Sequence, residues 1–485
     1  MTIDAFIHSL RDHHDLFDPA RPIVVARAPG RLDLMGGIAD YSGSLVLQLP
    51  LACAAYAAAQ WTTATPSLVT VRTADAGDVG GAGTVRVPLD DLLEDYDRVH
   101  ARLAADPRQR WAGYVAGALT ALHRERGVRP AHGVTWLVAS DVPPGKGVSS
   151  SAALEVAAMH ALTGLLGLSR RDSERADLPG RSSSEAGLPR RSVAEAGRDL
   201  ALLCQIVENR VVGAPCGVMD QMTAALGEAG TLLALRCQPA ELEPPVRLPG
   251  DVDVFGVDSG IRHAVTGADY GSVRVGAFMG YRIIAALAGL PARPAGEGRV
   301  AIDDSRWRGY LANVTPDEWE REFRDRVPER IGGGEFLGTY GGFTDTVTRI
   351  DPGRVYAVRE PAAHPIYEHA RVQRFRALLE SRPAAESALV ELGALMYASH
   401  ASYSACGLGS DGTDALVALA GPSRGVYGAK ITGGGSGGTV AVLARRGHRE
   451  VVEDVARRYS AATGRPAAII AGSSDGAVRF GTRLV

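Results

Sequence analysis

Two glycine-rich segments contain the only two lysines of this chain, Lys146 and Lys430, and every other basic side chain except histidine is arginine. Lys146 lies in residues 142–152 and Lys430 in residues 428–438. A compact ammonium on a flexible stem suits a phosphate oxygen in a tight loop, where a planar guanidinium is too wide. Chance is the alternative, but we interpret the pattern as phosphate chemistry. For Lys430, support of the glycine loop from outside is an equal alternative.

The segment around Lys146 has the order expected of an anion-binding loop. A β-like run at 134–139 leads into the glycines, and three serines at 149–151 open a helical pattern. Backbone N–H groups at a helix N-terminus lack partners within the helix and face the positive end of its dipole, so they attract phosphate. The segment does not fit the P-loop pattern GxxxxGK[S/T]. A serine-capped helix without a ligand is the structural alternative.

A second candidate for chemistry is the acid in segment 213–221, GAPCGVMDQ. Asp220 follows glycine, proline and small residues, and an aspartate in such a setting commonly serves only the turn. Taken alone, Glu208 would be a solvated glutamate at a helix end. Taken alone, Trp111 would be a core residue. The residue types by themselves therefore leave these three positions open.

Hydrophobic periodicity predicts two halves of mixed secondary structure that position these segments. The first half alternates β-like runs with helical patterns, at 23–28, 68–72 and 134–139 and at 111–124, 151–168 and 198–209. Polar residues, glycine and proline dominate 168–198, which predicts a solvated, mobile insertion. The second half has β-like runs at 231–236 and 252–258, helical patterns at 273–288 and 315–330, and a strand–glycine loop–strand unit at 426–444.

Composition indicates a globular intracellular protein. The 485 residues, of which 46% are hydrophobic, can fill two packed domains. A net charge of −3 without a basic run gives no reason to expect nucleic acid or a membrane surface as a partner. The five scattered cysteines indicate reduced thiols and no zinc site. The N-terminus does not read as a signal peptide, and the apolar run 45–61 contains Gln48 and Pro50, so we expect buried strands and a cytoplasmic location.

Three ordered motifs carry a resemblance to a known family. Residues 143–156 (PPGKGVSSSAALEV) resemble the nucleotide-binding loop of the GHMP kinases, which include galactokinases, homoserine kinases and mevalonate kinases. Residues 27–41 (RAPGRLDLMGGIADY) are similar to the galactokinase signature, and residues 430–438 (KITGGGSGG) to the C-terminal glycine motif. The resemblance implies an α+β, two-lobed fold with the active site in the cleft between the lobes. We expect the N-terminal lobe at 1–225 and the C-terminal lobe at 226–485.

The resemblance also implies a role for each matching residue. Asp220 would act as general base or orient the hydroxyl that is phosphorylated, and Arg31 would pair with it and offset charge on the transferring phosphoryl group. Ser151 and Glu208 would hold Mg²⁺, which prefers oxygen ligands. The implied ATP-binding residues are Pro144, Gly145, Lys146, Gly147, Val148, Ser149, Ser150, Ser151, Ala152 and Trp111. The implied sugar-binding residues are Gly37, Ile38, Asp40, Asp220, Tyr270 and Gly434, with Arg262 nearby.

The sugar is suggested by a departure from the signature. Galactokinases normally continue Gly-Glu-His-Thr-Asp-Tyr, and the Glu and His reach the C6 hydroxyl, whereas this chain has GGIADY at 36–41. Asp40 is kept while both polar contacts to C6 are lost, which favours L-arabinopyranose, a ring of galactose configuration without the C6 hydroxymethyl. Segments 36–44, 208–216, 256–264 and 364–371 also resemble the L-arabinokinase branch of the family.

We therefore expect a kinase that uses ATP and Mg²⁺ to convert L-arabinose to L-arabinose 1-phosphate. Two alternatives stay open. One is a galactokinase, or another anomeric kinase with relaxed recognition of C6. The other is a non-catalytic, sugar-sensing regulator on the same fold. The sequence does not predict an oligomeric state.

Overall fold

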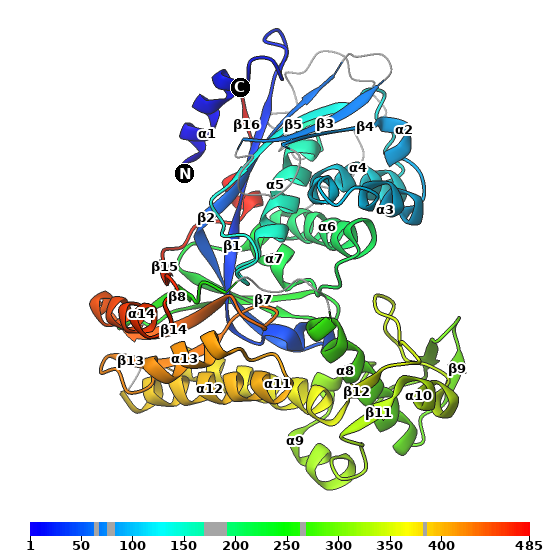
Figure 1. The fold of residues 1–485 in the computed structure, drawn as a ribbon, viewed down its shortest axis with the longest axis vertical. Helices are drawn as coiled ribbons and strands as arrows, with labels where there is room; N and C mark the ends of the chain where they lie inside the picture. Colours follow the sequence, from blue (N-terminus) through cyan, green and yellow to red (C-terminus); the bar gives the residue numbers. More distant parts are fainter. Residues whose placement is uncertain (63–66, 75–82, 169–191, 262–267, 382–385) are drawn as a thin grey trace.

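The computed structural model describes residues 1–62, 67–74, 83–168, 192–261, 268–381 and 386–485. Its central feature is a long antiparallel pair of strands, β1 (Val24–Met35) and β2 (Leu45–Trp61). Figure 1 shows that this pair runs from the top of the upper lobe down to the lower lobe. The turn that joins the strands contains the 3₁₀ helix η2 (Gly37–Ser42), which contacts α8 (Ala268–Leu287) and α11 (Arg359–Glu380) of the lower lobe.

The upper lobe is built on an eight-stranded sheet in the order β16-β1-β2-β5-β3-β4, with β6 paired to β2 and β7 paired to β6. Its other strands are β3 (Leu68–Thr73), β4 (Thr84–Pro88), β5 (Val134–Ser140), β6 (Thr231–Arg236), β7 (Glu241–Arg247) and β16 (Arg483–Leu484). Helices cover both faces, so β1 and β2 consist almost wholly of buried residues.

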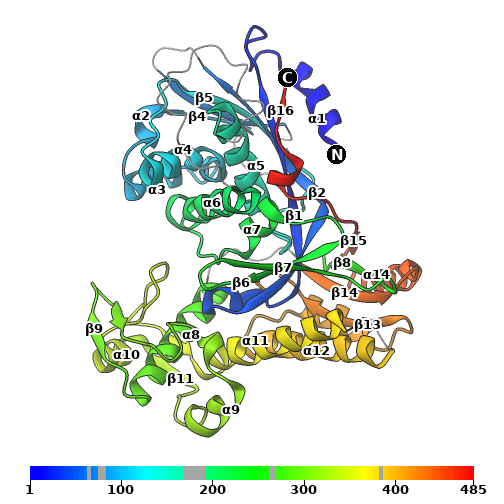
Figure 2. The ribbon, with the colours of Figure 1, turned by 180° about the vertical axis from the view of Figure 1, so that it is seen from behind.

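One face of this sheet carries most of the helices of the upper lobe (Figures 1 and 2). They are α2 (Leu89–Leu92), α3 (Tyr96–Ala104), α4 (Gly113–Arg126), α5 (Ser150–Leu165), α6 (Val193–Ile206) and α7 (Met219–Leu226). The short helix α1 (Ile3–Ser9) packs on the opposite face, where Ile3 and Phe6 join a separate buried cluster with Tyr56 and Leu137.

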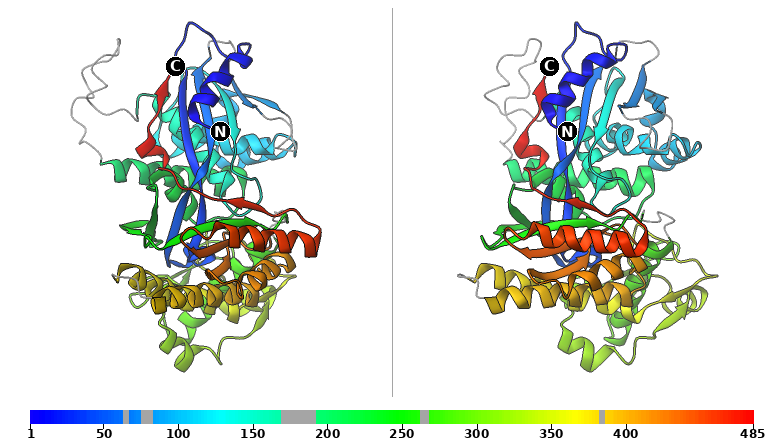
Figure 3. Two further views of the ribbon diagram at one scale, coloured as in Figure 1. Left: turned by 90° about the vertical axis from the view of Figure 1, so that its left-hand side faces the viewer. Right: turned by 60° about the vertical axis from the view of Figure 1, so that its left-hand side comes forward.

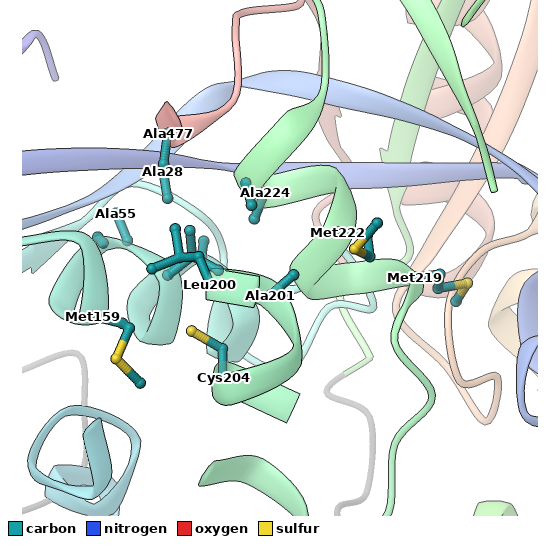
Figure 4. Packing of buried hydrophobic residues seen from close by; sticks show 14 of the residues in the cluster. Ala28, Ala55, Met159, Leu200, Ala201, Cys204, Met219, Met222, Ala224 and Ala477 are labelled. Atoms are coloured by element: carbon teal, nitrogen blue, oxygen red, sulfur yellow. The ribbon is translucent and has the colours of Figure 1, made fainter. Parts of the chain in front are cut away.

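Small side chains let the helices of the upper lobe lie close to the sheet. Ala28 of β1, Ala55 of β2 and Ala224 of α7 share one buried cluster with Leu200 and neighbouring residues of α6 (Figure 4). Tight packing of this kind holds each helix in one position. Because Asp220 lies in the first turn of α7, its backbone position is set by this cluster.

The lower lobe contains a four-stranded sheet in the order β13-β14-β8-β15, layered against helices (Figure 3). Its strands are β8 (Val252–Asp258), β13 (Val426–Ile431), β14 (Thr439–Arg445) and β15 (Ala468–Ile470). The helices are α11, α12 (Glu386–Ala405), α13 (Asp411–Ala420) and α14 (Arg449–Thr463), of which α12 packs along β13. The glycine motif is the connection between β13 and β14.

A separate aromatic cluster organises the segment between α8 and α11. Trp307, Trp319, Phe323, Phe336 and Phe343 are each at most 2% exposed and pack against α8. The elements of this segment are β9 (Ala292–Pro294), β10 (Val300–Ile302), α9 (Pro316–Glu318), the π-helix η7 (Trp319–Phe323), β11 (Arg330–Gly332), α10 (Gly333–Tyr340) and β12 (Val355–Ala357). The cluster thus forms a third hydrophobic core beside the two sheets.

The predicted α+β, two-lobed class is confirmed, and most predicted elements occur within a few residues of their expected positions. The apolar run 45–61 is one continuous strand, β2. Helix α6 begins at Val193, because Ser192 and Glu195 form a capping box inside the predicted insertion. The rest of that insertion, 169–191, lies outside the described residues. The structure also places β6, β7 and β16, which the predicted division assigns to the C-terminal lobe, in the sheet of the upper lobe.

The final residues return to the upper lobe. Helix α15 (Ala477–Phe480) packs Ala477 into the same buried cluster as Ala28 (Figure 4). Beyond it, β16 pairs with β1, and Ile23 and Val485 exchange two backbone hydrogen bonds. In the part of the chain that the structure describes, the helices are too short or too polar to cross a membrane.

Candidate functional site

Arg31 of β1 and Asp220 of α7 form a two-pronged ion pair. Nε of Arg31 donates to Oδ1 of Asp220 at 2.9 Å, and Nη2 donates to Oδ2 at 2.9 Å. The third nitrogen, Nη1, donates to the carbonyl oxygen of Gly147 at 2.6 Å. This parallel geometry is the strongest form of a carboxylate–guanidinium pair. The structure thus brings together the two predicted catalytic residues and joins them to the predicted nucleotide loop.

Ser149 connects the loop to the same carboxylate. Its backbone is left-handed (φ 61°), and its hydroxyl donates to Oδ2 of Asp220. Consequently Ser149, the N-cap of α5, makes no side-chain capping hydrogen bond to the first turn of that helix. The first backbone N–H groups of an uncapped helix attract an anion. The alternative of a helix capped by its own serine is therefore wrong.

The nucleotide loop packs directly on the C-terminal glycine motif. A Cβ at Gly433 would lie 2.6 Å from the carbonyl oxygen of Gly147, and a Cβ at Gly438 would lie 2.6 Å from that of Lys146. Only glycine permits this approach of two backbones. Gly434 lies between these contacts and is partly exposed. Nζ of Lys146 pairs with Oδ1 of Asp258, at the end of β8, at 3.0 Å.

The second lysine does not face a ligand. Nζ of Lys430 lies 2.7 Å from Oδ2 of Asp33 and 2.8 Å from the carbonyl oxygen of Ile431. Asp33 also accepts hydrogen bonds from the side chain of Gln48 and from the backbone of Gly37. Both ionic groups are wholly buried, and their pairing connects the glycine motif to β1. The interpretation of this lysine as a phosphate contact is wrong, and the alternative of support from outside the loop holds.

The predicted metal ligands lie in a buried acidic cluster. Glu208 is the second residue of the π-helix η5 (Val207–Val212), and helices of this kind often occur at functional sites. Burial, together with the negative charge of Asp220, raises the pKa of Glu208 to about 7, while a hydrogen bond from Ser151 opposes the shift. Nε2 of Gln221 donates to Glu208 at 2.7 Å and to Glu155 at 3.1 Å.

Glu155 is a member of this cluster that sequence reasoning missed. Burial and the charge of Glu208 raise its pKa well above the usual value. One carboxyl and one hydroxyl, from Glu208 and Ser151, give the hard oxygen donors that Mg²⁺ prefers. Within the described residues, no three His, Cys, Asp or Glu side chains converge on one metal position. That sparse set fits Mg²⁺, which is commonly held by one or two carboxylates together with substrate phosphates.

Asp40 is a further buried carboxyl group that interacts electrostatically with Asp220. Its Oδ1 accepts from the backbone N–H of Tyr41 at 2.6 Å, and its Oδ2 lies so near Gly217 that a Cβ there would be 1.7 Å away. Burial and the charge of Asp220 raise the pKa of Asp40 to about 7. Two carboxyl groups thus face one region from different elements, which suits a neutral, hydroxyl-rich ligand that both donates and accepts hydrogen bonds.

Arg274 of α8 is a site residue that sequence reasoning missed. It forms two 2.8 Å hydrogen bonds with the buried Asp345 and a 3.2 Å hydrogen bond to the carbonyl oxygen of Cys216, and it lies over the Tyr41 ring. A signal was available, because Arg274 and Arg282 are the only charged residues in the largely apolar helical pattern at 273–288. A buried arginine requires an acidic partner, but the sequence does not reveal that Asp345 is that partner.

The remaining predicted residues surround this region to different degrees. Ile38 is 1% exposed and joins an apolar cluster with Val273 and Tyr403, so its side chain packs inward. The ring of Tyr270 lies edge-on to Tyr41, with 6.0 Å between centroids. Trp111 is partly buried against the main core of the upper lobe. Arg262 lies outside the described residues.

Comparisons with known proteins show which proteins this chain resembles. Residues 113–190 match the GHMP kinases N terminal domain, residues 378–462 the GHMP kinases C terminal domain, and residues 11–60 the galactokinase galactose-binding signature. An L-arabinokinase of Arabidopsis thaliana is 43% identical over 96% of this chain. The chain covers 47% of that relative's length.

Galactokinases are more distant relatives. The galactokinase of Chloroflexus aggregans is 29% identical over 92% of this chain and 90% of its own length. The solved structure of Lactococcus lactis galactokinase complexed with galactose superposes with a TM-score of 0.71 and 20% identity, covering 97% of this chain and 99% of that chain. The superposition on the Lactococcus lactis galactokinase structure establishes the fold.

Proposed function

This chain belongs to the GHMP kinases and is a sugar kinase of that family, and from this premise we propose that it phosphorylates the anomeric hydroxyl of L-arabinose. ATP is the phosphoryl donor, and the products are L-arabinose 1-phosphate and ADP. Similarity to the Arabidopsis L-arabinokinase supports the substrate. The observation that carries the choice is the turn at 37–40, where the residues before Asp40 offer no polar side chain toward a hexose C6 hydroxyl.

Asp220 and Arg31 carry the transfer. The carboxylate of Asp220 accepts the proton of the anomeric hydroxyl, or orients that hydroxyl toward the γ-phosphate, and Arg31 fixes both of its oxygens. Transition states of phosphoryl transfer are loose, so alignment and charge stabilisation contribute more than nucleophile strength. The same guanidinium, hydrogen-bonded to the loop at Gly147, lies between the base and the phosphate-binding segment.

The nucleotide is held by the loop 144–152, through the N-terminal amides of α5 and Lys146, with Trp111 toward the adenine. Glu208 and Ser151 would hold Mg²⁺, which when bound neutralises charge on the phosphates. Gln221 orients the Glu208 carboxyl by donating to it. Asp40, with Tyr270 and the backbone near Gly434, would bind the ring hydroxyls of the sugar.

Galactokinase activity is the second candidate, because residues 11–60 match the galactose-binding signature. A non-catalytic sensor is disfavoured, because neither the Arg31–Asp220 pair nor the oxygen donors of Glu208 and Ser151 would have a function in such a protein. Both alternatives make a different prediction for the same assay.

The test is ADP release with Mg-ATP and, in turn, L-arabinose, D-galactose, D-glucuronate and L-fucose, with kcat/KM compared. We expect the highest value for L-arabinose. A higher value for D-galactose would overturn the substrate but not the kinase assignment. No sugar-dependent ADP release would favour the sensor, provided that sugar binding is measured independently by calorimetry.

A further inference from the structure

We propose that Tyr403 is a specificity-determining residue that closes the space beside Gly37, where a sugar-binding side chain would otherwise stand. Tyr403 lies on α12, far from Gly37 in the sequence, and is 0% exposed. The inference rests on the proposed function in one respect, namely that the sugar binds beside the turn at 37–40.

The hydroxyl of Tyr403 occupies the position that a side chain at residue 37 would need. A Cβ built on Gly37 would lie 1.5 Å from Oη of Tyr403, 2.7 Å from its Cζ and 2.9 Å from Oδ2 of Asp33, so the contacts with Tyr403 are the shortest. These distances are far shorter than van der Waals contact, which is about 3.5–4.0 Å between carbon atoms. The φ of Gly37, +41°, adds a conformational preference for glycine. No side chain fits at residue 37 while Tyr403 keeps its place.

Tyr403 is held in this position from several directions. Its Oη accepts a hydrogen bond from the backbone N–H of Ile38 at 2.8 Å and donates one to the carbonyl oxygen of Gly433 at 3.0 Å. The His364 ring packs against it in a T-shaped arrangement, and the ammonium of Lys430 lies 5.2 Å from the centre of the Tyr403 ring. Moving Tyr403 aside would break two buried hydrogen bonds and leave their partner groups unpaired in the interior, which is unfavourable.

As a consequence, the turn at 37–40 can recognise a sugar only through the side chain of Asp40 and through the backbone groups of the turn. The hydroxyl of Tyr403 is already engaged, and Ile38 packs into the apolar cluster beside it. An exocyclic hydroxymethyl on the sugar would therefore find no polar partner from Gly37, Ile38 or Tyr403. A pentopyranose has no exocyclic hydroxymethyl, so it loses no hydrogen bond when that polar partner is missing. A site without the matching hydrogen bonds discriminates by roughly 10–200-fold rather than by more.

The decisive variant combines Gly37→Glu with Tyr403→Ala, and is compared with the wild type and with each single variant. We expect Gly37→Glu alone to lower the Tm and to reduce kcat/KM for both L-arabinose and D-galactose. Adding Tyr403→Ala should raise the Tm above that of Gly37→Glu. It should also shift the ratio of the two kcat/KM values toward D-galactose by about 10-fold or more. A folded double variant with the wild-type ratio would overturn the proposal.

A gentler pair keeps the proposal testable if the double variant does not fold. Gly37→Ala is measured in the wild type and in a Tyr403→Phe background, which lacks the hydroxyl. We expect a smaller loss of Tm in the second background, because the shortest contact is gone, while the φ penalty is common to both. Equal losses would overturn the proposal.

Tyr459→Phe is the matched control, since Tyr459 is also 0% exposed and its hydroxyl also donates to a backbone carbonyl, that of Ser259. Its removal should leave the cost of Gly37→Ala unchanged. If it relieves that cost as well as Tyr403→Phe does, the proposal fails. A wild-type preference for D-galactose would overturn the proposed substrate, whereas Tyr403 is judged by how substitution changes the ratio.

Discussion

The ammonium of Lys430 lies 2.7 Å from the carboxylate of Asp33, and neither side chain has exposed surface. The pair joins β13, which leads into the glycine motif, to β1, which carries Arg31. A buried ion pair is costly to form and still more costly to break on one side, because the remaining charge stays desolvated. This lysine therefore sets the distance between two segments of the site without contacting a ligand.

Lys430→Met should lower the free energy of unfolding by about 3–5 kcal/mol, because Asp33 is left charged and unpaired. Urea unfolding measures the loss. The double variant Asp33→Asn/Lys430→Met should recover part of it, since the isolated charge is gone. Lys146→Met is the matched control and should lose less stability while raising KM for ATP. A double variant as unstable as Lys430→Met would contradict the argument.

Asp220→Asn should lower kcat by roughly 10²–10⁴-fold, the usual contribution of a positioned acid or base. The amide keeps one oxygen for Arg31 but cannot take up a proton. Sugar affinity, measured by calorimetry, should change little. Turnover within about 3-fold of the wild type would remove Asp220 from the chemistry.

The pKa of Glu208 predicts how stability depends on pH. Its value is raised from 4.5 to about 7, so between these pH values the folded protein binds more protons than the unfolded chain. The free energy of unfolding should therefore fall as pH rises across this window and level off above it. Relative to Glu208→Gln, the wild type should lose about 2–4 kcal/mol. Parallel stability curves for the two proteins would contradict the shift.

The same titration should control Mg²⁺ binding. Below pH 7 Glu208 is largely protonated and offers a poor ligand, so Mg²⁺ with a non-hydrolysable ATP analogue should raise the Tm more at pH 8 than at pH 6. Glu208→Gln should abolish this difference. A stabilisation of equal size at both pH values in the wild type would argue against Glu208 as the ligand.

Arg274→Met should cost about 3–5 kcal/mol of stability, because Asp345 is left buried without its partner. It should also raise KM for the sugar, since Arg274 holds the Cys216 carbonyl and the Tyr41 ring beside Asp40. Arg306→Met is the control. Its pair with Glu318 is partly exposed, so about 0–1 kcal/mol is expected. An unchanged sugar KM in Arg274→Met would limit its role to stability.

Local sequence patterns predicted many of the elements, whereas the pairing of Arg31 with Asp220 was implied by the family resemblance. The glycine loop, the serines and the acid at 220 are short-range signals, and the strand–loop–helix order around Lys146 follows from them. The helix boundary at Val193 was missed because the capping box lies in a polar stretch that reads as loop. Strand β7 and helices α11 and α12 were also not predicted; in α11, Pro365 and many charged residues interrupt any simple apolar stripe.

The unpredicted site residues depend on contacts between distant segments. Gly37 is visible in the sequence as a missing side chain, but nothing local reveals that Tyr403 fills its place. Arg274 is conspicuous by its apolar neighbours, whereas its partner Asp345 is not. The two lysines look equivalent in their glycine-rich settings, and only the fold separates the partly exposed Lys146 from the buried Lys430.

The pairing of β16 with β1 has a consequence for how the protein forms in the cell. Strand β1 precedes the whole lower lobe in the chain, but its neighbour on one side, residues 483–484, follows it. Ala477, which fills part of the core beside Ala28, also arrives late. Because synthesis runs from the N-terminus to the C-terminus, the upper lobe can be completed only after the lower lobe has been synthesised.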